Sequence, residues 1–362
     1  MKPRARLRRC LVKAHLWLGL TIGAVWAVQG ATGALLVYHR DIDRMIGVRG
    51  TQGPMVSLDR VAQAAGGADG LIRIGFRDTV GTVLAVDRSD KRTVLIDAAT
   101  ARVLAVRDTD PTLPGADGAA WRWLYQLHEA LLLHDAGETL TGISGLFLLG
   151  AALMGLWLAW PRGGGWWIVF DPRRWKSPAQ RLYGWHRGGG LLASAGFVLM
   201  TLTGAWLIFA SDLRPVVARW VRFEMPAHVA PGTGDIVGPQ RAYEIAQGQF
   251  PKARLFRVTL PSTKGNAYTV RLRQRGELRH LSGTSSVTID AATGRVIGRY
   301  DPLTAPIANR LADAAFAVHS GEALGVVGRT MVLLLGLSLP MFYATGLIAW
   351  LNRRKRKTRA LA

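Results

Sequence analysis

Four long apolar stretches constrain this 362-residue chain more than any other feature of its sequence. Each is about 20 residues long and contains no Lys, Arg, Asp or Glu, as expected for a helix that crosses a lipid bilayer. They cover residues 16–38, 141–160, 191–210 and 331–351. The first is too long for a signal peptide and no small-residue cleavage pattern follows it, so we predict a retained membrane helix.

The charged residues lie beside these stretches. The chain has 46 Lys and Arg against 24 Asp and Glu, a formal net charge of +22. The short flanks 1–14, 161–187 and 352–362 carry six basic residues each, and four spans would place all three on one side of the membrane. The positive-inside rule makes that side cytoplasmic, and attraction to anionic lipid explains the basic excess without nucleic acid. Both termini are therefore predicted to be cytoplasmic.

Several classes of chemistry are excluded by composition and motif. The single cysteine, Cys10, rules out an internal disulfide framework, a multi-cysteine zinc site and a cysteine-ligated iron–sulfur cluster. The sequence has no Walker loop, dinucleotide glycine fingerprint, Gly-x-Ser-x-Gly or His-Glu-x-x-His. A redox role would therefore require electrons from quinol or from a separate cytoplasmic reductase.

The chain repeats itself. Matching positions are His15 with His186 and Gly33 with Gly204 at an offset of 171 residues, and His128 with His319 at an offset of 191 residues. The segment that begins Asp97-Ala-Ala-Thr recurs from Asp290 at an offset of 193 residues. Each half is read as helix, external segment, helix. Because both halves have the same topology, a pseudo-twofold axis would run along the membrane normal.

The external segments are read as small α+β modules. Short helices are expected over 58–65 and 240–249, and strands rich in Val, Ile and Thr are expected over 71–76, 82–86, 93–97, 103–106, 255–260, 267–272, 286–289 and 296–299. Each module is small for an independent core, so we expect it to dock on the other module or on the membrane helices. Amphipathic helices follow the modules and are expected on the outer membrane surface.

The predicted fold is a membrane α-helical protein with four transmembrane helices, a two-fold internal duplication and two small extracytoplasmic α+β modules. Its segments are a basic N-terminus (1–14), the first span (15–39), the first module (40–118), an interfacial helix (119–140), the second span (141–161), a basic loop (162–186), the third span (187–210), the second module (211–302), an interfacial helix (303–324), the fourth span (325–351) and a basic tail (352–362).

The duplicated histidines are the candidates for chemistry. His15 and His186 lie at cytoplasmic span ends, and His128 and His319 lie at external span ends. Two histidines from different helices at one depth form the bis-imidazole arrangement that holds a b-type haem in a helical bundle, so two haems are predicted. For a single interfacial histidine the simpler alternative is a solvated side chain or a core hydrogen bond.

Glycines and neighbouring polar residues complete the candidate set. His15 and Gly33 are 18 residues apart, as are His186 and Gly204, so on straight helices each pair shares a face. A glycine there would admit a flat porphyrin or a neighbouring backbone, and ordinary small-residue packing is the alternative. The remaining candidates are His39 and His134, which could ligate the outer haem or contact substrate, and Arg40 and Arg187, which could pair with haem propionates or simply contact lipid.

The chain resembles the PepSY-associated transmembrane family of iron-regulated bacterial inner-membrane proteins over nearly its whole length. The matching motifs are His15-x-x-x-Gly19-Leu20 with Thr32-Gly33, Leu127-His128 with Gly137 and Trp160-Pro161-Arg162, His186 with Thr203-Gly204, and His319-Ser-Gly321 with Thr345-Gly346. The Asp97 and Asp290 strand endings are similar to the ending of a PepSY module. Two departures are Met154-Gly155, where the family has Ser or Thr before the glycine, and the extra His134.

Some members of this family are ferric-siderophore reductases that hold two b haems across the membrane. The resemblance implies a bacterial inner-membrane enzyme with periplasmic modules that passes electrons outward to a ferric siderophore, and it assigns haem ligation to His15, His128, His186 and His319. A non-catalytic PepSY protein that binds or regulates a periplasmic partner is the alternative. A permease would require charged or broken helices at mid-membrane, and none of the four apolar stretches carries a charge.

Overall fold

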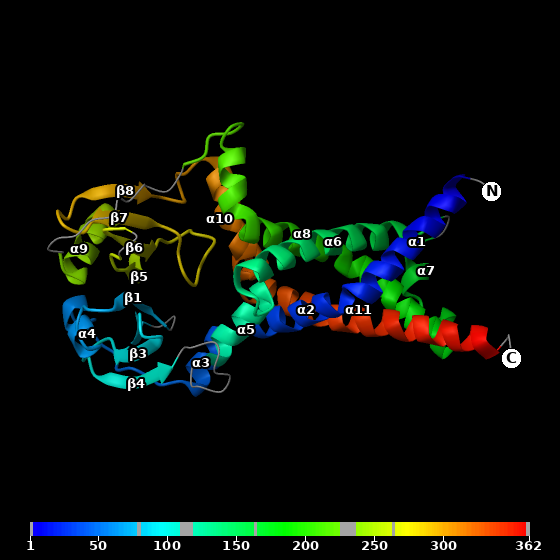
Figure 1. The fold of residues 1–362 in the computed structure, drawn as a ribbon, viewed down its shortest axis with the longest axis horizontal. Coiled ribbons are helices and arrows are strands. Elements are labelled where there is room, and N and C mark those ends of the chain that lie inside the picture. The colour runs from blue at the N-terminus through cyan, green and yellow to red at the C-terminus, as the bar shows by residue number, and fades with distance from the viewer. Residues whose placement is uncertain are drawn as a thin grey trace.

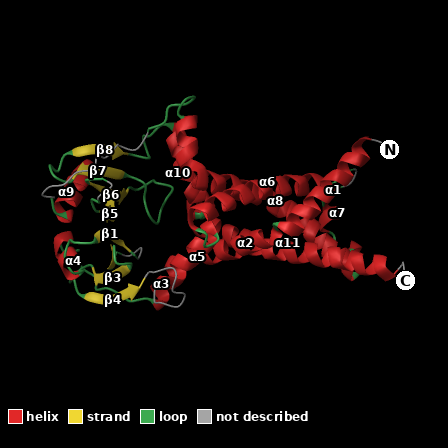
Figure 2. Cartoon of the chain, viewed as in Figure 1, coloured by secondary structure: helices red, strands yellow, loops and turns green. Residues whose placement is uncertain are grey.

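A computed structural model describes residues 3–77, 81–108, 119–162, 165–224, 237–262 and 265–359. A long helical bundle occupies one end of the molecule, and a β-sheet with two short helices occupies the other (Figure 1). Both chain ends lie at the end of the bundle far from the sheet (Figure 1). The strands of the described residues all lie at the sheet end of the molecule, and the bundle is helical (Figure 2).

The bundle contains the apolar stretches. Its long helices are α1 (Pro3–Thr21), α2 (Gly23–Val37), α6 (His134–Ala159), α8 (Pro178–Val217) and α11 (Gly325–Arg359). Three helices are long and apolar enough to cross a membrane, and the bent pair α1 and α2 makes a fourth if it counts as one span. Helix α6 packs on α8 and α11 packs on α2, so each helix of one half contacts a helix of the other.

Two helix breaks were not predicted. The expected first span, 15–39, is divided at Ile22, where α1 and α2 meet at an angle of 62°. The expected interfacial helix, 119–140, is also divided: α5 (Ala119–Ala130) ends early, and α6 starts at His134, before the expected start of the second span at residue 141. Positive φ angles at Leu131, Leu132 and His134 make this turn.

Gly137 explains why the turn can be so tight. It lies within the first turn of α6. A Cβ atom at Gly137 would lie 1.7 Å from the carbonyl oxygen of Ala130, so only glycine lets α6 pass the end of α5 this closely.

The other helical elements near the bundle are α3 (His39–Ile46), α7 (Trp167–Phe170), η1 (Pro172–Arg174), α10 (Ile307–His319) and η2 (Glu322–Leu324).

The two external segments share one antiparallel sheet of eight strands in the order β4-β3-β2-β1-β5-β6-β7-β8. The strands are β1 (Leu71–Phe76), β2 (Val83–Arg88), β3 (Arg92–Asp97), β4 (Val103–Asp108), β5 (Arg254–Thr259), β6 (Ala267–Arg273), β7 (Ser286–Asp290) and β8 (Val296–Tyr300). All eight predicted strands are present. The expectation that each module would dock on the other is met because the two meanders join edge to edge at β1 and β5.

The two central strands, β1 and β5, pair symmetrically about Ile74 and Val258. Arg73 pairs with Thr259, Ile74 pairs with Val258 and Gly75 pairs with Arg257. Strand β1 has an irregularity between Leu71 and Arg73, and β5 has one between Leu255 and Arg257, so the same kink occurs at matching places in both halves. A self-complementary pairing of this kind joins two alike surfaces through a local twofold axis.

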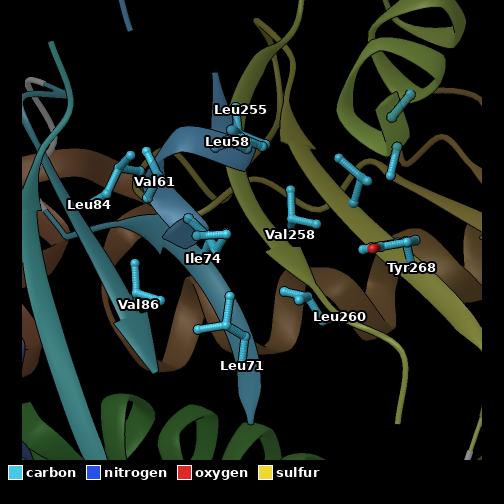
Figure 3. Packing of buried hydrophobic residues seen from close by; sticks show 14 of the residues in the cluster. Leu58, Val61, Leu71, Ile74, Leu84, Val86, Leu255, Val258, Leu260 and Tyr268 are labelled. Atoms are coloured by element: carbon cyan, nitrogen blue, oxygen red, sulfur yellow. The ribbon is translucent and has the colours of Figure 1, made fainter. Parts of the chain in front are cut away.

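One core lies between the sheet and two short helices. The helices α4 (Leu58–Ala64) and α9 (Pro239–Gln249) cover the face of the sheet away from the bundle (Figure 1). The buried cluster takes side chains from both halves, among them Ile74, Val258 and Tyr268 (Figure 3). The helix starts are tied across the halves, because the side chain of Gln240 accepts from the Leu58 N–H at 2.9 Å.

Asp97 fastens the linker from the bundle to the sheet. Its carboxylate accepts hydrogen bonds from the backbone N–H and hydroxyl of Thr51, at 2.8 and 2.7 Å, and from the N–H groups of Ala99 and Thr100. Burial of the carboxyl would raise its pKa, but these hydrogen bonds outweigh it and lower the pKa of Asp97 from 3.8 to about 2. The matching residue, Asp290, accepts from Thr293 but has no bond to a linker among the described residues.

We predict that Asp97→Asn lowers the free energy of unfolding of the detergent-solubilised chain by about 1–3 kcal/mol, because it replaces charge-assisted bonds in a buried position. Since the folded-state pKa lies below the ordinary value, this contribution is present above about pH 4 and is lost as the pH falls towards 2. Thermal melts at pH 7 and pH 3 measure both effects. Asp290→Asn is the matched control, and an equal loss in the two variants would contradict the linker role.

Candidate functional site

The structure brings His15 and His186 together at the end of the bundle near the chain termini. His15 lies on α1 and His186 on α8, and their ring centres are 6.2 Å apart with an angle of 84° between the rings. The Nδ1 atom of His15 is 3.1 Å from the carbonyl oxygen of Ala151 on α6. The Nδ1 atom of His186 is 2.9 Å from the hydroxyl of Thr345 on α11.

A second pair lies at the other end of the bundle. His128 at the end of α5 and His319 at the end of α10 have ring centres 6.2 Å apart, at an angle of 51°. The Nδ1 atom of His128 is 2.9 Å from the carbonyl oxygen of Gln29 and 3.2 Å from the Thr32 hydroxyl. The Nδ1 atom of His319 is 3.2 Å from the carbonyl oxygen of Met200 and 3.1 Å from the Thr203 hydroxyl.

These contacts assign the tautomer of each ring. A carbonyl oxygen can only accept, so Nδ1 of His15, His128 and His319 must carry the proton and donate. The Thr345 hydroxyl donates to the carbonyl of Phe342 at 3.1 Å, so its oxygen is available to accept from His186. With Nδ1–H as the donor in all four rings, each Nε2 keeps a free lone pair. This is the arrangement of a metal-ligating histidine, whose other ring nitrogen donates to a carbonyl or hydroxyl.

Each ring rests against a glycine of the neighbouring helix. A Cβ atom added to Gly33 would lie 2.7 Å from Cε1 of His128, and one added to Gly204 would lie 3.1 Å from Cε1 of His319. At the other pair, the corresponding distances are 3.3 Å from Gly155 to His15 and 3.8 Å from Gly346 to His186. The glycines therefore let a histidine ring lie close to a helix backbone.

This corrects one prediction about the glycines. We expected Gly33 to share a helix face with His15 and Gly204 to share one with His186, where each glycine would admit a porphyrin or a neighbouring backbone. The structure places Gly33 against His128 and Gly204 against His319, at the opposite end of the bundle. The 62° bend at Ile22 removes the straight-helix geometry on which the first expectation depended. On the continuous helix α8, His186 and Gly204 are about 27 Å apart along the axis.

Sequence analysis named the Thr-Gly pairs as motifs of the family resemblance but connected none of their hydroxyls to a particular histidine. Three of the four glycines follow a threonine, in Thr32-Gly33, Thr203-Gly204 and Thr345-Gly346, and each of these hydroxyls contacts a histidine Nδ1. At the fourth, Met154-Gly155, no hydroxyl is available and His15 bonds to the Ala151 carbonyl alone among the described residues. The Thr-Gly pairs are therefore the sequence signal for these positions.

Few large side chains of the described part of the bundle are fully buried. The largest fully buried side chains of the described residues all belong to the sheet domain, Tyr268 and Leu58 among them. The buried apolar cluster within the bundle consists of Ala159, Val169 and Leu191. All four paired histidines are only partly buried. Facing imidazoles in a bundle without a continuous apolar core fit a flat apolar cofactor.

Two further histidines were candidates for the outer site, and the structure keeps both apart from it. The Nδ1 atom of His39 is 2.6 Å from the carbonyl oxygen of Leu36, and its ring packs 5.8 Å from that of Trp121. His134 is the exposed first residue of α6. Among the described residues, neither ring contacts His128 or His319. Because the helix breaks between α5 and α6, His134 does not continue the helix that carries His128.

The two candidate arginines have protein partners. Arg187 donates from Nε and Nη2 to the carbonyl oxygen of Ala159, at 3.2 and 3.0 Å, and so satisfies the last carbonyl of α6. Arg40 lies on α3 with its guanidinium 5.8 Å from the centre of the Phe256 ring in the sheet. Arg187 is therefore near the first pair, whereas Arg40 faces the sheet.

Comparison with known proteins gives one family. The family model described as the PepSY-associated TM region matches residues 12–353, nearly the whole chain. The chain therefore belongs to the PepSY-associated transmembrane family, as its sequence motifs indicated. A search of curated proteins found no match.

We predict that Gly33→Ala destabilises the solubilised protein by about 1–3 kcal/mol, because its methyl group would overlap the His128 ring and force it from its position. Thermal unfolding of the full chain measures the loss. Gly19→Ala is the matched control, since nothing lies within 4 Å of a Cβ atom there. Equal melting temperatures for the two variants would show that the contact between Gly33 and His128 is not tight.

Proposed function

From its family and its two histidine pairs, we propose that this protein is a di-haem b-type cytochrome of the bacterial inner membrane that reduces ferric siderophore in the periplasm and releases iron. The observation that carries the proposal is the repeated geometry of the pairs. Each has ring centres 6.2 Å apart and both Nδ1 atoms held by hydrogen bonds. Siderophores bind ferric iron through hard oxygen ligands, so reduction to Fe(II) weakens that grip.

The residues present fit haem. With metal–nitrogen distances of about 2 Å on both sides, two imidazoles ligating one iron have ring centres about 6 Å apart. Both pairs have this spacing without further movement of the helices. When bound, haem b supplies reversible one-electron transfer. His15 and His186 would hold the inner haem, and His128 with His319 would hold the outer one.

The chain's own contribution is to fix and tune the ligands. Hydrogen bonds from Nδ1–H hold the direction of each Nε2 and raise the basicity of the imidazole. The hydroxyls of Thr32, Thr203 and Thr345 act in this way at three rings. His15 has the Ala151 carbonyl as its acceptor, so the two ligands of the inner pair differ in their support.

The proposed topology has four spans, with α1 and α2 forming the first, and a two-fold internal duplication. The six basic residues in each of the flanks 1–14, 161–187 and 352–362 support a cytoplasmic location for both termini. The first pair then lies near the cytoplasm, where quinol or a separate reductase would donate electrons. The second pair lies beneath the periplasmic sheet, where the ferric substrate would accept them.

We predict that the double variant His15→Ala/His186→Ala retains one haem b per chain, and that His128→Ala/His319→Ala also retains one, because each pair forms an independent site. The pyridine haemochrome assay of purified protein counts the haem. His134→Ala is the control and should retain both. Full haem content in either double variant would refute the ligand assignment.

We also predict that Thr345→Val raises the reduction potential of the inner haem and leaves that of the outer haem unchanged. Loss of the hydroxyl removes an acceptor from His186 Nδ1–H, which lowers the basicity of the ligand and disfavours the ferric state. A spectroelectrochemical titration resolves the two potentials. Thr330→Val, at a hydroxyl that contacts Tyr38 and no histidine among the described residues, is the control. A shift of the outer potential alone would contradict the pairing.

A colourless purified protein, even after expression with added haem, would favour the alternative function. The chain would then be a PepSY membrane protein that binds or regulates a periplasmic partner without catalysis.

A further inference from the structure

Four arginines converge between the sheet and the bundle. Arg257 on β5 and Arg271 on β6 are register partners. Their neighbours Val258 and Val270 belong to the core beneath α4 and α9, so the two arginines lie on the opposite face of the sheet, towards the bundle (Figure 1). Arg40 and Arg279 complete the group, which we call the four-arginine cluster.

Aromatic rings hold the members of the four-arginine cluster in place. The guanidinium groups of Arg40 and Arg257 lie 5.8 and 5.6 Å from the centre of the same ring, that of Phe256. Arg279 lies 4.0 Å from the ring centre of Phe316 on α10. It also donates from Nε to the Ser282 hydroxyl at 3.1 Å. Cation–π contacts of this kind fix a guanidinium without neutralising it.

The cluster lacks direct ion pairs. Among the described residues, none of its four arginines forms an ion pair with a carboxylate, whereas Arg73, Arg77 and Arg329 nearby pair with Asp87, Asp43 and Asp41. Three carboxylates attract the cluster without pairing with it: Glu322 acts on Arg40 and Arg279, Asp313 acts on Arg271 and Arg279, and Glu277 acts on Arg271.

Holding these charges together is unfavourable. Burial, followed by repulsion from Arg271 and Arg73, lowers the pKa of Arg257 to about 10. Burial also lowers the pKa of Arg40, Arg271 and Arg279, although Glu322 partly offsets it at Arg40 and Arg279. An anion placed among the four guanidinium groups would relieve this repulsion.

The four-arginine cluster lies over the outer histidine pair. Phe316, which supports Arg279, is three residues before His319 on α10. Arg40 is on α3, directly after the helix that carries Thr32 and Gly33. Arg40 also lines an open pocket of about 400 Å³ between α3 and the start of β2. A ligand bound at the four-arginine cluster would lie between the sheet and the proposed outer haem.

We propose that the four-arginine cluster binds an anionic ferric chelate, one whose iron is held by carboxylate or catecholate oxygens, in preference to a neutral hydroxamate chelate. Guanidinium groups match such oxygens because they are planar, permanently charged and able to donate two parallel hydrogen bonds. This inference rests on the proposed function, which makes a ferric chelate the electron acceptor, and adds the charge class of that substrate.

The test is equilibrium dialysis of the full-length, detergent-solubilised protein against ferric citrate, a neutral ferric trihydroxamate and iron-free citrate. We expect ferric citrate to bind, with an affinity that falls as salt is added, and the neutral chelate to bind at least about tenfold more weakly. Equal affinity for the neutral chelate would overturn the charge preference. Equal affinity for iron-free citrate would overturn the assignment to a ferric chelate.

The double variant Arg257→Gln/Arg271→Gln should weaken ferric citrate binding by about tenfold or more. The matched control Arg241→Gln/Arg254→Gln removes the same charge from exposed positions on α9 and β5 and should bind as the wild type does. Equal binding by the two double variants would overturn the proposal. If the first variant does not fold, wild-type binding of ferric citrate that does not weaken as salt is added would overturn it instead. Because dialysis does not need haem, a haem-free protein would refute the proposed function and leave this result readable.

Discussion

The hydrogen bond from each histidine Nδ1–H to a neighbouring helix is the interaction on which the bundle's proposed role depends. It assigns the Nδ1–H tautomer to four imidazoles and leaves each Nε2 with a free lone pair, and both pairs have the same 6.2 Å distance between ring centres. The glycines at 33, 155, 204 and 346 make it possible, because each lets a ring approach a helix backbone. A polar ring held this closely has little freedom to turn, which is the preorganisation that a cofactor site requires.

The shared sheet gives the bundle a rigid cover. Each four-stranded meander is small for an independent core, and the pairing of β1 with β5 merges the two around one core that includes Ile74 and Val258. The linker to this sheet is fastened at Asp97, and α3 is tied to α11 by the ion pair of Arg329 with Asp41. The sheet therefore presents the four-arginine cluster at a fixed position above the outer histidine pair.

Local patterns in the sequence predicted the elements, but long-range geometry did not follow from them. Segments rich in Val, Ile and Thr predicted all eight strands. The internal repeat predicted the pairs His15 with His186 and His128 with His319, and the structure contains both. The bend at Ile22 and the left-handed turn at Leu131 and Leu132 have no proline and are set by packing. Gly33 and Gly204 meet the histidines at the opposite end of the bundle from those expected, in one half on a bent helix pair and in the other on a continuous helix. The four-arginine cluster unites residues from four separate segments, which no local pattern brings together.

The most direct test of the central claim is the absorption spectrum and pyridine haemochrome count of the purified wild-type protein, oxidised and then reduced with dithionite. The two histidine pairs predict about two haem b per chain, both with the sharp α and β bands of a six-coordinate low-spin iron. One haem per chain would show that only one pair is a ligand set. A colourless protein, purified from cells supplied with haem, would contradict the cytochrome proposal altogether.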